Sequence, residues 1–368
     1  MSSTVSRVFL VWVVLFAGFA GTSNAQEHLR PREAGIRIGT FPPGPWNAIT
    51  DVPGVLVGHA TLIRGDSIRT GVTAILPHDG DLFRDRVRAA IVVGNGFGKL
   101  VGLSQVQELG ELETPVLLTG TLSVFRAADA LVDTLLLTAG NENIRSINPV
   151  VGETNDGFLS DIRARPIGST EVRAALRNAT SGPVLEGAVG AGTGTTALGY
   201  KGGIGTASRR VTSNTGMYTV GVLVQTNFGG SLVIDGVPVG RMLKNGSPHD
   251  RAGGGSIMLV IATDAPLEHR QLERLASRSF GGLSRAGASL SHGSGDYAIA
   301  FTVSGDPPDY GGGFLSDLFV GVMEATEEAI VASLFAARTT SGHLGSSEGL
   351  PVGRVLKLLR EAGRLTTP

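Results

Sequence analysis

Several residue types are scarce or missing in the 368-residue chain, and each absence excludes a class of function. Cysteine is absent, so neither disulfide bonds nor a cysteine nucleophile is available. Charged residues make up only 17%, the net charge is −1 and there is no basic block, so we expect no nucleic-acid partner. The 7 histidines are dispersed without the spacing of metal ligands, so we expect no bound metal.

Three common functional motifs are also missing. The stretch "GAGTG" at 190–194 lacks the G-x-G-x-x-G spacing of a dinucleotide site. The stretch "GFGKL" at 96–100 lacks the first glycine and the Ser/Thr of a phosphate-binding P-loop. No G-x-S-x-G nucleophile elbow occurs either. We therefore expect no cofactor.

Glycine is abundant instead, with 54 residues, about twice its usual share of roughly 7%. The glycines lie between apolar runs without a period, which indicates tight turns and close backbone approaches rather than collagen or disorder. Hydrophobic residues make up 42%, and no linker divides the chain. Buried-looking strands alternating with amphipathic helices predict one α+β domain.

The N-terminus has the three parts of a signal peptide. Arg7 precedes the apolar run "VFLVWVVLFAGFAG", and a small-x-small site ends at Ala25. The alternative is a membrane anchor, but the run of about 14 residues is shorter than the roughly 20 that span a bilayer. We predict a signal peptide over residues 1–25, a periplasmic or secreted protein, and no membrane contact after its removal.

Sequence periodicity predicts the main elements of the domain. Strands are expected at 70–77, 89–98, 217–229, 256–264 and 297–305, and helices at 125–140 and from 315 onward. A hairpin is predicted around Asp235-Gly236. Asp264 is predicted to cap a helix that has Pro266 in its first turn.

The stretch "GGGSIMLVIATD" places three glycines and a serine directly before an apolar strand. If the Gly255–Ser256 bond were cut, Ser256 would carry a hydroxyl and a free α-amine together. Such an amine has a pKa of roughly 7.7–8.0, against roughly 10.4 for lysine, so it can act as a base near neutral pH. This is the N-terminal-nucleophile arrangement. The alternative is an ordinary Gly-Ser surface loop.

Other stretches decide between these interpretations. The motifs "WNAITDVPGVLVGH", "VVGETNDGFLSDIR", "YKGGIGTASR", "VQTNFG" and "HGSGDYAIAF" follow one another along the chain. Together with "GSIMLVIATDAPL", they resemble the self-processing serine aminopeptidases, the group of L-aminopeptidase/D-esterases and β-peptidyl aminopeptidases, over roughly residues 34–360. The resemblance implies an αββα sandwich of N-terminal-nucleophile type. It also implies cleavage into an α chain (26–255) and a β chain (256–368).

The resemblance further implies hydrolysis of small peptides, amino-acid amides or esters, with D- or β-amino acids accepted by some members. It implies no metal or cofactor and a homo-oligomer of αβ units. Ser256 matches the nucleophile, and Gly255 matches the residue before the cut. Asn227 matches an oxyanion donor, while Ser294 and Asp296 match the pair that orients the nucleophile and its amine.

Glu153 matches an acidic residue that pairs with the substrate ammonium. The chain departs from the pattern at two positions of the site. Asn155 stands where characterised members have tyrosine, whose hydroxyl faces the oxyanion of the substrate. The Asn amide could donate a hydrogen bond there instead, but its side chain is shorter. Asp296 stands where members can have glutamate, so its reach is one methylene shorter.

Two other functions stay open at this point. One is an acyltransferase of the ornithine acetyltransferase type, which also cuts itself but usually through threonine. The other is an unprocessed, non-catalytic binding protein that has the same fold.

Overall fold

The computed structural model describes residues 29–213, 216–243, 255–306 and 313–365 of the chain. The predicted signal peptide at 1–25 and the glycines before Gly255 lie outside these ranges. Among the described residues, none of the helices combines the length and the apolar character that crossing a bilayer requires.

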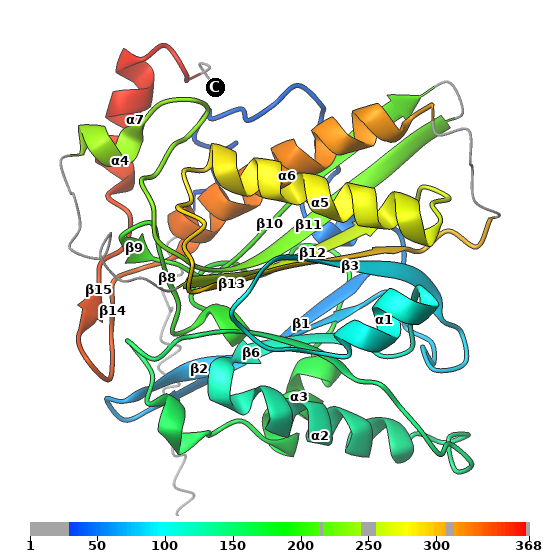
Figure 1. The fold of residues 1–368 in the computed structure, drawn as a ribbon. Helices are drawn as coiled ribbons and strands as arrows, with labels where there is room; N and C mark the ends of the chain where they lie inside the picture. The colour runs from blue at the N-terminus through cyan, green and yellow to red at the C-terminus, as the bar shows by residue number, and fades with distance from the viewer. Residues whose placement is uncertain (1–28, 214–215, 244–254, 307–312, 366–368) are drawn as a thin grey trace, which may run out of the picture.

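Two β-sheets pack face to face, and helices cover both outer surfaces (Figure 1). The first sheet has the order β10-β11-β12-β13-β3-β5 and the second the order β1-β2-β6-β7-β4. Helices α5 and α6 lie on the first sheet, and α2 and α3 lie on the second. This arrangement confirms the predicted α+β class and the αββα sandwich.

The main strands of the first sheet are β3 (Val87–Gly96), β5 (Glu111–Leu112), β10 (Ile204–Ser213), β11 (Gly216–Asn227), β12 (Gly255–Thr263) and β13 (Ser294–Thr302). Those of the second are β1 (Leu56–Arg64), β2 (Ile68–Leu76), β4 (Leu100–Val101), β6 (Val116–Gly120) and β7 (Val150–Thr154). Short two-residue strands form two further pairs, β8 (Thr196–Ala197) with β9 (Tyr200–Lys201) and β14 (Thr340–Ser341) with β15 (Ser346–Ser347).

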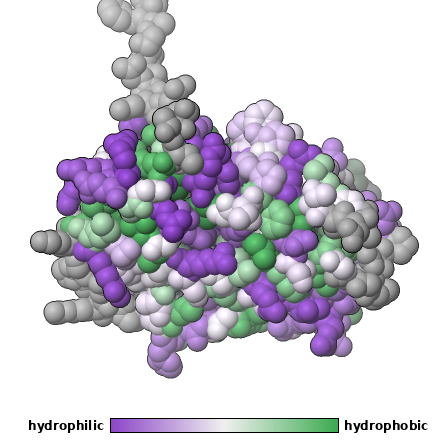
Figure 2. Space-filling model, turned by 90° about the horizontal axis from the view of Figure 1, so that it is seen from above, coloured by the Kyte–Doolittle hydropathy of each residue, from purple (hydrophilic) through white to green (hydrophobic). Residues whose placement is uncertain are grey.

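The α-helices are α1 (Leu103–Leu109), α2 (Val124–Leu136), α3 (Ser169–Arg177), α4 (Val239–Met242), α5 (His269–Arg285), α6 (Leu315–Ala336) and α7 (Val352–Glu361). Single 3₁₀ turns occur at η1 (Ile49–Asp51), η2 (Thr121–Ser123), η3 (Ile162–Ala164) and η4 (Gly190–Gly192). On the face seen from above, hydrophilic side chains are interspersed with small apolar areas (Figure 2).

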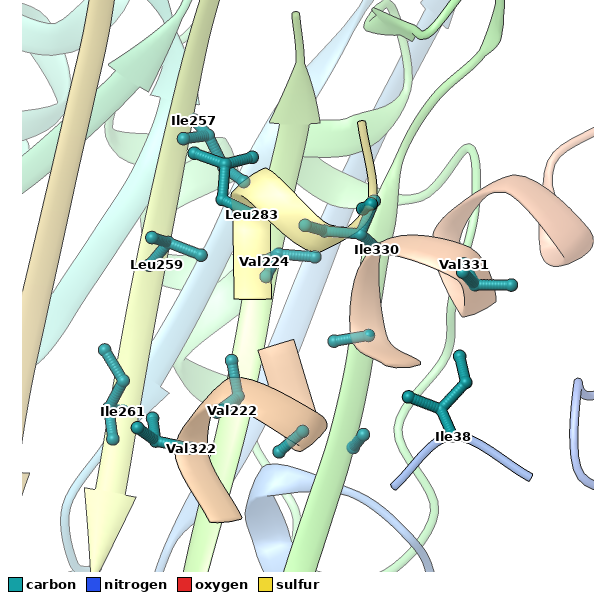
Figure 3. Close-up of a cluster of buried hydrophobic side chains, with 14 of the residues drawn as sticks. Ile38, Val222, Val224, Ile257, Leu259, Ile261, Leu283, Val322, Ile330 and Val331 are labelled. Atoms are coloured by element: carbon teal, nitrogen blue, oxygen red, sulfur yellow. The ribbon is translucent and has the colours of Figure 1, made fainter. Parts of the chain in front are cut away.

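Strand β12 is buried on both faces, which explains its unbroken apolar sequence. Side chains alternate along a strand, so its residues divide between two cores. Met258, Val260 and Ala262 pack between the sheets. The opposite face, drawn in Figure 3, points toward α5 and α6 and carries Ile257, Leu259 and Ile261.

The local predictions are confirmed at the strands and at the long helices, but the helix cap was placed wrongly. Helix α5 begins at His269, and Glu268 caps it by accepting hydrogen bonds from the N–H groups of Arg270 and Gln271. Asp264 instead accepts a 2.7 Å hydrogen bond from the N–H of Thr219, near the start of the neighbouring strand β11. The carboxylate therefore satisfies a donor of the sheet before the chain reaches the helix. At Asp235-Gly236 the predicted turn is present, but it connects an isolated β-bridge between Ile234 and Val237 instead of two longer strands.

A buried ion network joins helix α6 to strand β10. Arg209 is fully buried and contacts Glu324 at 3.1 Å and Glu328 at 2.6 Å. Arg32 reaches Glu328 from the N-terminal segment at 2.8 Å. Burial alone would raise the pKa of Glu328, but Arg209 and Arg32 lower it below the ordinary value. The network is therefore ionised, and it ties the first described residues to the core.

We expect Glu328→Gln to destabilise the fold, because it leaves two guanidinium groups near a neutral side chain. Breaking a buried pair typically costs about 3–5 kcal/mol. Urea unfolding at pH 7 measures the free energy of unfolding. Glu361→Gln is the matched control, because its pair with Lys357 spans 3.9 Å on the surface and should matter by less than about 0.5 kcal/mol. Equal effects of the two substitutions would show that the network adds no stability.

Candidate active site

The strand order places Ser256 at the centre of the first sheet. Ser256 pairs with Asn227 of β11 on one side and with Gly295 of β13 on the other. The residue is only 3% exposed. Its side chain shares a strand face with Met258, which packs between the two sheets. The Ser256 hydroxyl therefore points toward the second sheet, where β7 ends.

The main chain of Asn155 meets this hydroxyl. Asn155 directly follows β7, and its N–H donates a 3.4 Å hydrogen bond to Ser256 Oγ. Its side-chain oxygen accepts a bond from Gly157 N–H at 3.0 Å, within its own turn. The sequence prediction assigned the side chain of Asn155 to substrate binding. The structure instead brings the backbone N–H to Ser256, and the substrate role of the side chain stays a prediction.

Asn227 is held between two main-chain groups. Its Oδ1 accepts a 3.1 Å bond from Thr196 N–H, and its Nδ2 donates a 3.0 Å bond to the Asn155 carbonyl. Because Thr196 N–H needs an acceptor, the side-chain oxygen of Asn227 faces Thr196 and the NH₂ group faces the other way. The Asn227 NH₂ group thus points toward the loop that also contacts Ser256. A backbone N–H and an amide donor beside a hydroxyl can stabilise negative charge that develops there.

Ser294 and Asp296 lie on β13, next to the Gly255–Ser256 peptide. Ser294 is the register partner of Gly255, and Asp296 is the partner of Ile257. Ser294 Oγ donates to Asp296 Oδ2 at 2.6 Å, and both side chains are buried. Within the part of the chain that the structure describes, no hydrogen bond joins either side chain to the Ser256 hydroxyl. They line a small pocket together with Leu290, and their strand partners are the residues before and after Ser256.

Glu153 lies on β7 and is only 3% exposed. Its Oε1 accepts a hydrogen bond from Lys99 N–H at 3.0 Å and lies 3.4 Å from Lys99 Nζ. Gly98 packs closely here, because a Cβ there would lie 3.2 Å from Gly295 Cα and 3.3 Å from Glu153 Oε1. Since Gly295 is the strand partner of Ser256, Gly98 lies between the Glu153 carboxylate and the strand next to Ser256.

Lys99 was not identified from the sequence as part of the site. The stretch "GFGKL" was considered only as a P-loop, and its lysine has no neighbouring carboxylate in the sequence. In the structure Lys99 Nζ also donates a 2.8 Å bond to Thr121 Oγ1. Among the described residues, no group of His, Asp and Glu side chains is arranged to hold a metal ion.

Comparisons with known proteins agree on one family. The family model "Peptidase family S58" matches residues 47–347. Beta-peptidyl aminopeptidase BapA of Sphingosinicella xenopeptidilytica is 39% identical over 90% of this chain and 91% of its own length. The structure of a beta-aminopeptidase from Burkholderia sp. has a TM-score of 0.85, with 42% identity over 92% of this chain and all of that one.

A second similar structure identifies the fold. It is the L-aminopeptidase D-Ala-esterase/amidase from Ochrobactrum anthropi, described as a prototype for the serine aminopeptidases and a new variant of the Ntn hydrolase fold. The TM-score is 0.85 at 35% identity, covering 92% of this chain and 100% of that one.

We expect Asp296→Asn, made in the Ser256→Ala chain that should stay uncut, to be at least as stable at pH 8 as the Ser256→Ala chain itself. Burial raises the pKa of Asp296, and the hydrogen bond from Ser294 opposes that rise only in part. A carboxyl with a raised pKa destabilises the folded state when it is ionised, and this cost disappears as the pH falls through the raised value. The advantage of the variant should therefore shrink between pH 8 and pH 4. Thermal unfolding at both values measures it, and a loss of stability confined to pH 8 would contradict the prediction.

Proposed function

The chain belongs to peptidase family S58 and is a serine aminopeptidase with an Ntn hydrolase fold, and on that premise we propose that it is exported and cuts itself between Gly255 and Ser256. The observation that carries the proposal is the position of Ser256. It is the second residue of a strand that is buried on both faces, with candidate oxyanion donors on one side and the Ser294–Asp296 pair on the other.

The proposed self-cleavage starts with attack of Ser256 Oγ on the Gly255 carbonyl carbon. The C–N bond breaks, the new ester is hydrolysed by water, and Ser256 is left with a free α-amine. That amine then acts as the base for substrate hydrolysis. Because Ser294 and Asp296 flank the main chain of Ser256, they are placed to bind the amine and pass its proton.

In the proposed turnover, Ser256 Oγ attacks the substrate carbonyl and gives its proton to the terminal amine. The amine then protonates the leaving group, and water releases the acyl-enzyme. Asn227 Nδ2 and Asn155 N–H supply the hydrogen bonds to the oxyanion. In the uncut chain Asn155 N–H already donates to Ser256 Oγ, and Asn227 Nδ2 donates to the Asn155 carbonyl. Both donors therefore lie beside Ser256, and little reorganisation is needed.

We assign Glu153 to the free ammonium of the substrate. Its carboxylate is buried, lies beside Gly98 and Gly295, and holds a cation in this structure. The Lys99 side chain is 37% exposed, so it has room to move aside when a substrate ammonium arrives. A carboxylate in this position favours removal of N-terminal residues over internal cleavage.

The names of the relatives support a substrate class. Their names cover β-peptidyl substrates and D-alanine esters and amides, which supports small peptides, amino-acid amides and esters as substrates here, with D- or β-residues included. The N-terminal segment supports export to the periplasm or medium. The working form we propose is a homo-oligomer of cleaved αβ units.

We predict that the purified protein contains a C-terminal chain that begins at Ser256 and runs to Pro368. N-terminal sequencing after denaturing electrophoresis identifies that residue. Ser256→Ala should give a folded, uncut and inactive chain, because among the described residues the hydroxyl takes part in one hydrogen bond, of 3.4 Å. Ser284→Ala on α5 is the matched control and should be cut like the parent. If the Ser256→Ala chain is still cut at the same bond, an external protease is responsible.

We predict that Glu153→Gln raises KM for a free amino-acid p-nitroanilide about ten- to hundredfold. An ammonium–carboxylate hydrogen bond contributes roughly 1.5–3 kcal/mol, and tenfold in affinity corresponds to about 1.4 kcal/mol. Self-cleavage involves no ammonium at this position, so it should proceed as in the parent. Lys99→Met keeps the carboxylate and removes the resident cation, so its KM should not rise. If the parent hydrolyses the N-acetylated analogue equally well, Glu153 does not select the amine.

A further inference from the structure

Lys201 is a buried cation for which the proposed reaction gives no role. Its side chain is fully buried on β9, and burial lowers the pKa of Lys201 to about 7. In the described part of the chain, no carboxylate is within ion-pair distance of it. Its Nζ donates instead to two backbone carbonyls, that of Gly192 at 2.9 Å and that of Gly202 at 2.7 Å. Burying an ammonium is costly, so the presence of a lysine at this buried position needs an explanation.

The two carbonyls lie at the two ends of one short hairpin. Gly192 precedes β8, and Gly202 follows β9, so the Lys201 ammonium joins the ends of segment 192–202. Gly202 N–H also donates to the Thr195 carbonyl at 3.1 Å, and Thr195 Oγ1 donates to the Gly192 carbonyl at 3.1 Å. These bonds together close the base of the hairpin.

This hairpin supplies the group that orients Asn227. Thr196 N–H, one residue after the clamped base, donates to Asn227 Oδ1. Asn227 then donates to the Asn155 carbonyl, and Asn155 N–H donates to Ser256 Oγ. A continuous path of hydrogen bonds and adjacent residues therefore leads from Lys201 to the candidate nucleophile.

We propose that Lys201 is a positioning residue, whose ammonium clamps the 192–202 hairpin so that Thr196 holds the Asn227 amide with its NH₂ group toward the reacting carbonyl. The proposal rests on the proposed role of Asn227 as an oxyanion donor. Lys201 touches neither substrate nor Ser256. Without the clamp, Thr196 N–H shifts and the Asn227 amide loses its fixed direction.

A double-mutant cycle tests this with Lys201→Met, Asn227→Ala and the double variant. Rates with an amino-acid p-nitroanilide are expressed per mole of chain that begins at Ser256, so that incomplete self-cleavage does not enter. We expect Asn227→Ala to lower kcat by about 10²–10³. Lys201→Met should lower kcat about tenfold with little change in KM, and it should cause almost no further loss in the Asn227→Ala background. Lys357→Met, on the surface of α7, is the control and should match the parent.

Two results overturn the proposal. One is an unchanged kcat in Lys201→Met, and the other is an equal loss in both backgrounds, which indicates a structural role unrelated to Asn227. If Asn227→Ala itself turns over normally, the oxyanion assignment fails first, and the single variant reveals this. Should Lys201→Met not accumulate as folded protein, Lys201→Gln, which keeps one amide donor, goes through the same cycle.

Discussion

The site depends on one constraint, which is that β12 is buried on both of its faces. A slip of one residue would turn Met258 and Val260 toward the helices and Ile257 and Leu259 toward the other sheet. Both cores would then have to repack, so the register is strongly determined. The same register puts Ser256 opposite Asn227 and beside Gly295. The hydrophobic packing of the strand therefore sets the position of its first polar residue.

Glycine lets the two sheets approach closely enough to share a site. A Cβ at Gly152 would lie 2.7 Å from Met258 Sδ, so the Met258 side chain would have to shift in the closely packed core if a larger residue stood there. A Cβ at Gly98 would press on Gly295 and on the Glu153 carboxylate. The high glycine content thus has a structural meaning near the site. Glycine occupies positions where loops and strands of different sheets meet too closely for a larger side chain.

The sequence predicted the parts of the fold that depend on local pattern. Apolar strands and amphipathic helices could be recognised because their signal lies within a few neighbouring residues. Ser256 could not be told from an ordinary Gly-Ser loop by its neighbours, and it was singled out by the resemblance of motifs spread along the chain. The contacts of Asp264 and Lys99 could not, since their partners lie on distant segments. Those of Lys201 are close in the sequence, but its partners are backbone carbonyls, which no side-chain pattern marks. The backbone of Asn155 was missed for another reason. Its N–H exists in nearly every residue type, so no side-chain pattern marks it, whereas Glu153 and Asn227 carry side chains that motifs can show.

The position of the Gly255–Ser256 bond at the start of β12 also affects how long the molecule survives. From Ser256 to Thr263, strand β12 is paired on both sides, with β11 from before the break and with β13 from after it. A break at that bond would leave two chains interleaved in one sheet, with no covalent link between them. Neither chain could separate without opening the sheet and both cores. Once opened, the two pieces would have to find each other again as a bimolecular reaction. The lifetime of the mature protein would then be governed by the rate at which it opens, so it would be stable kinetically rather than by reversible equilibrium.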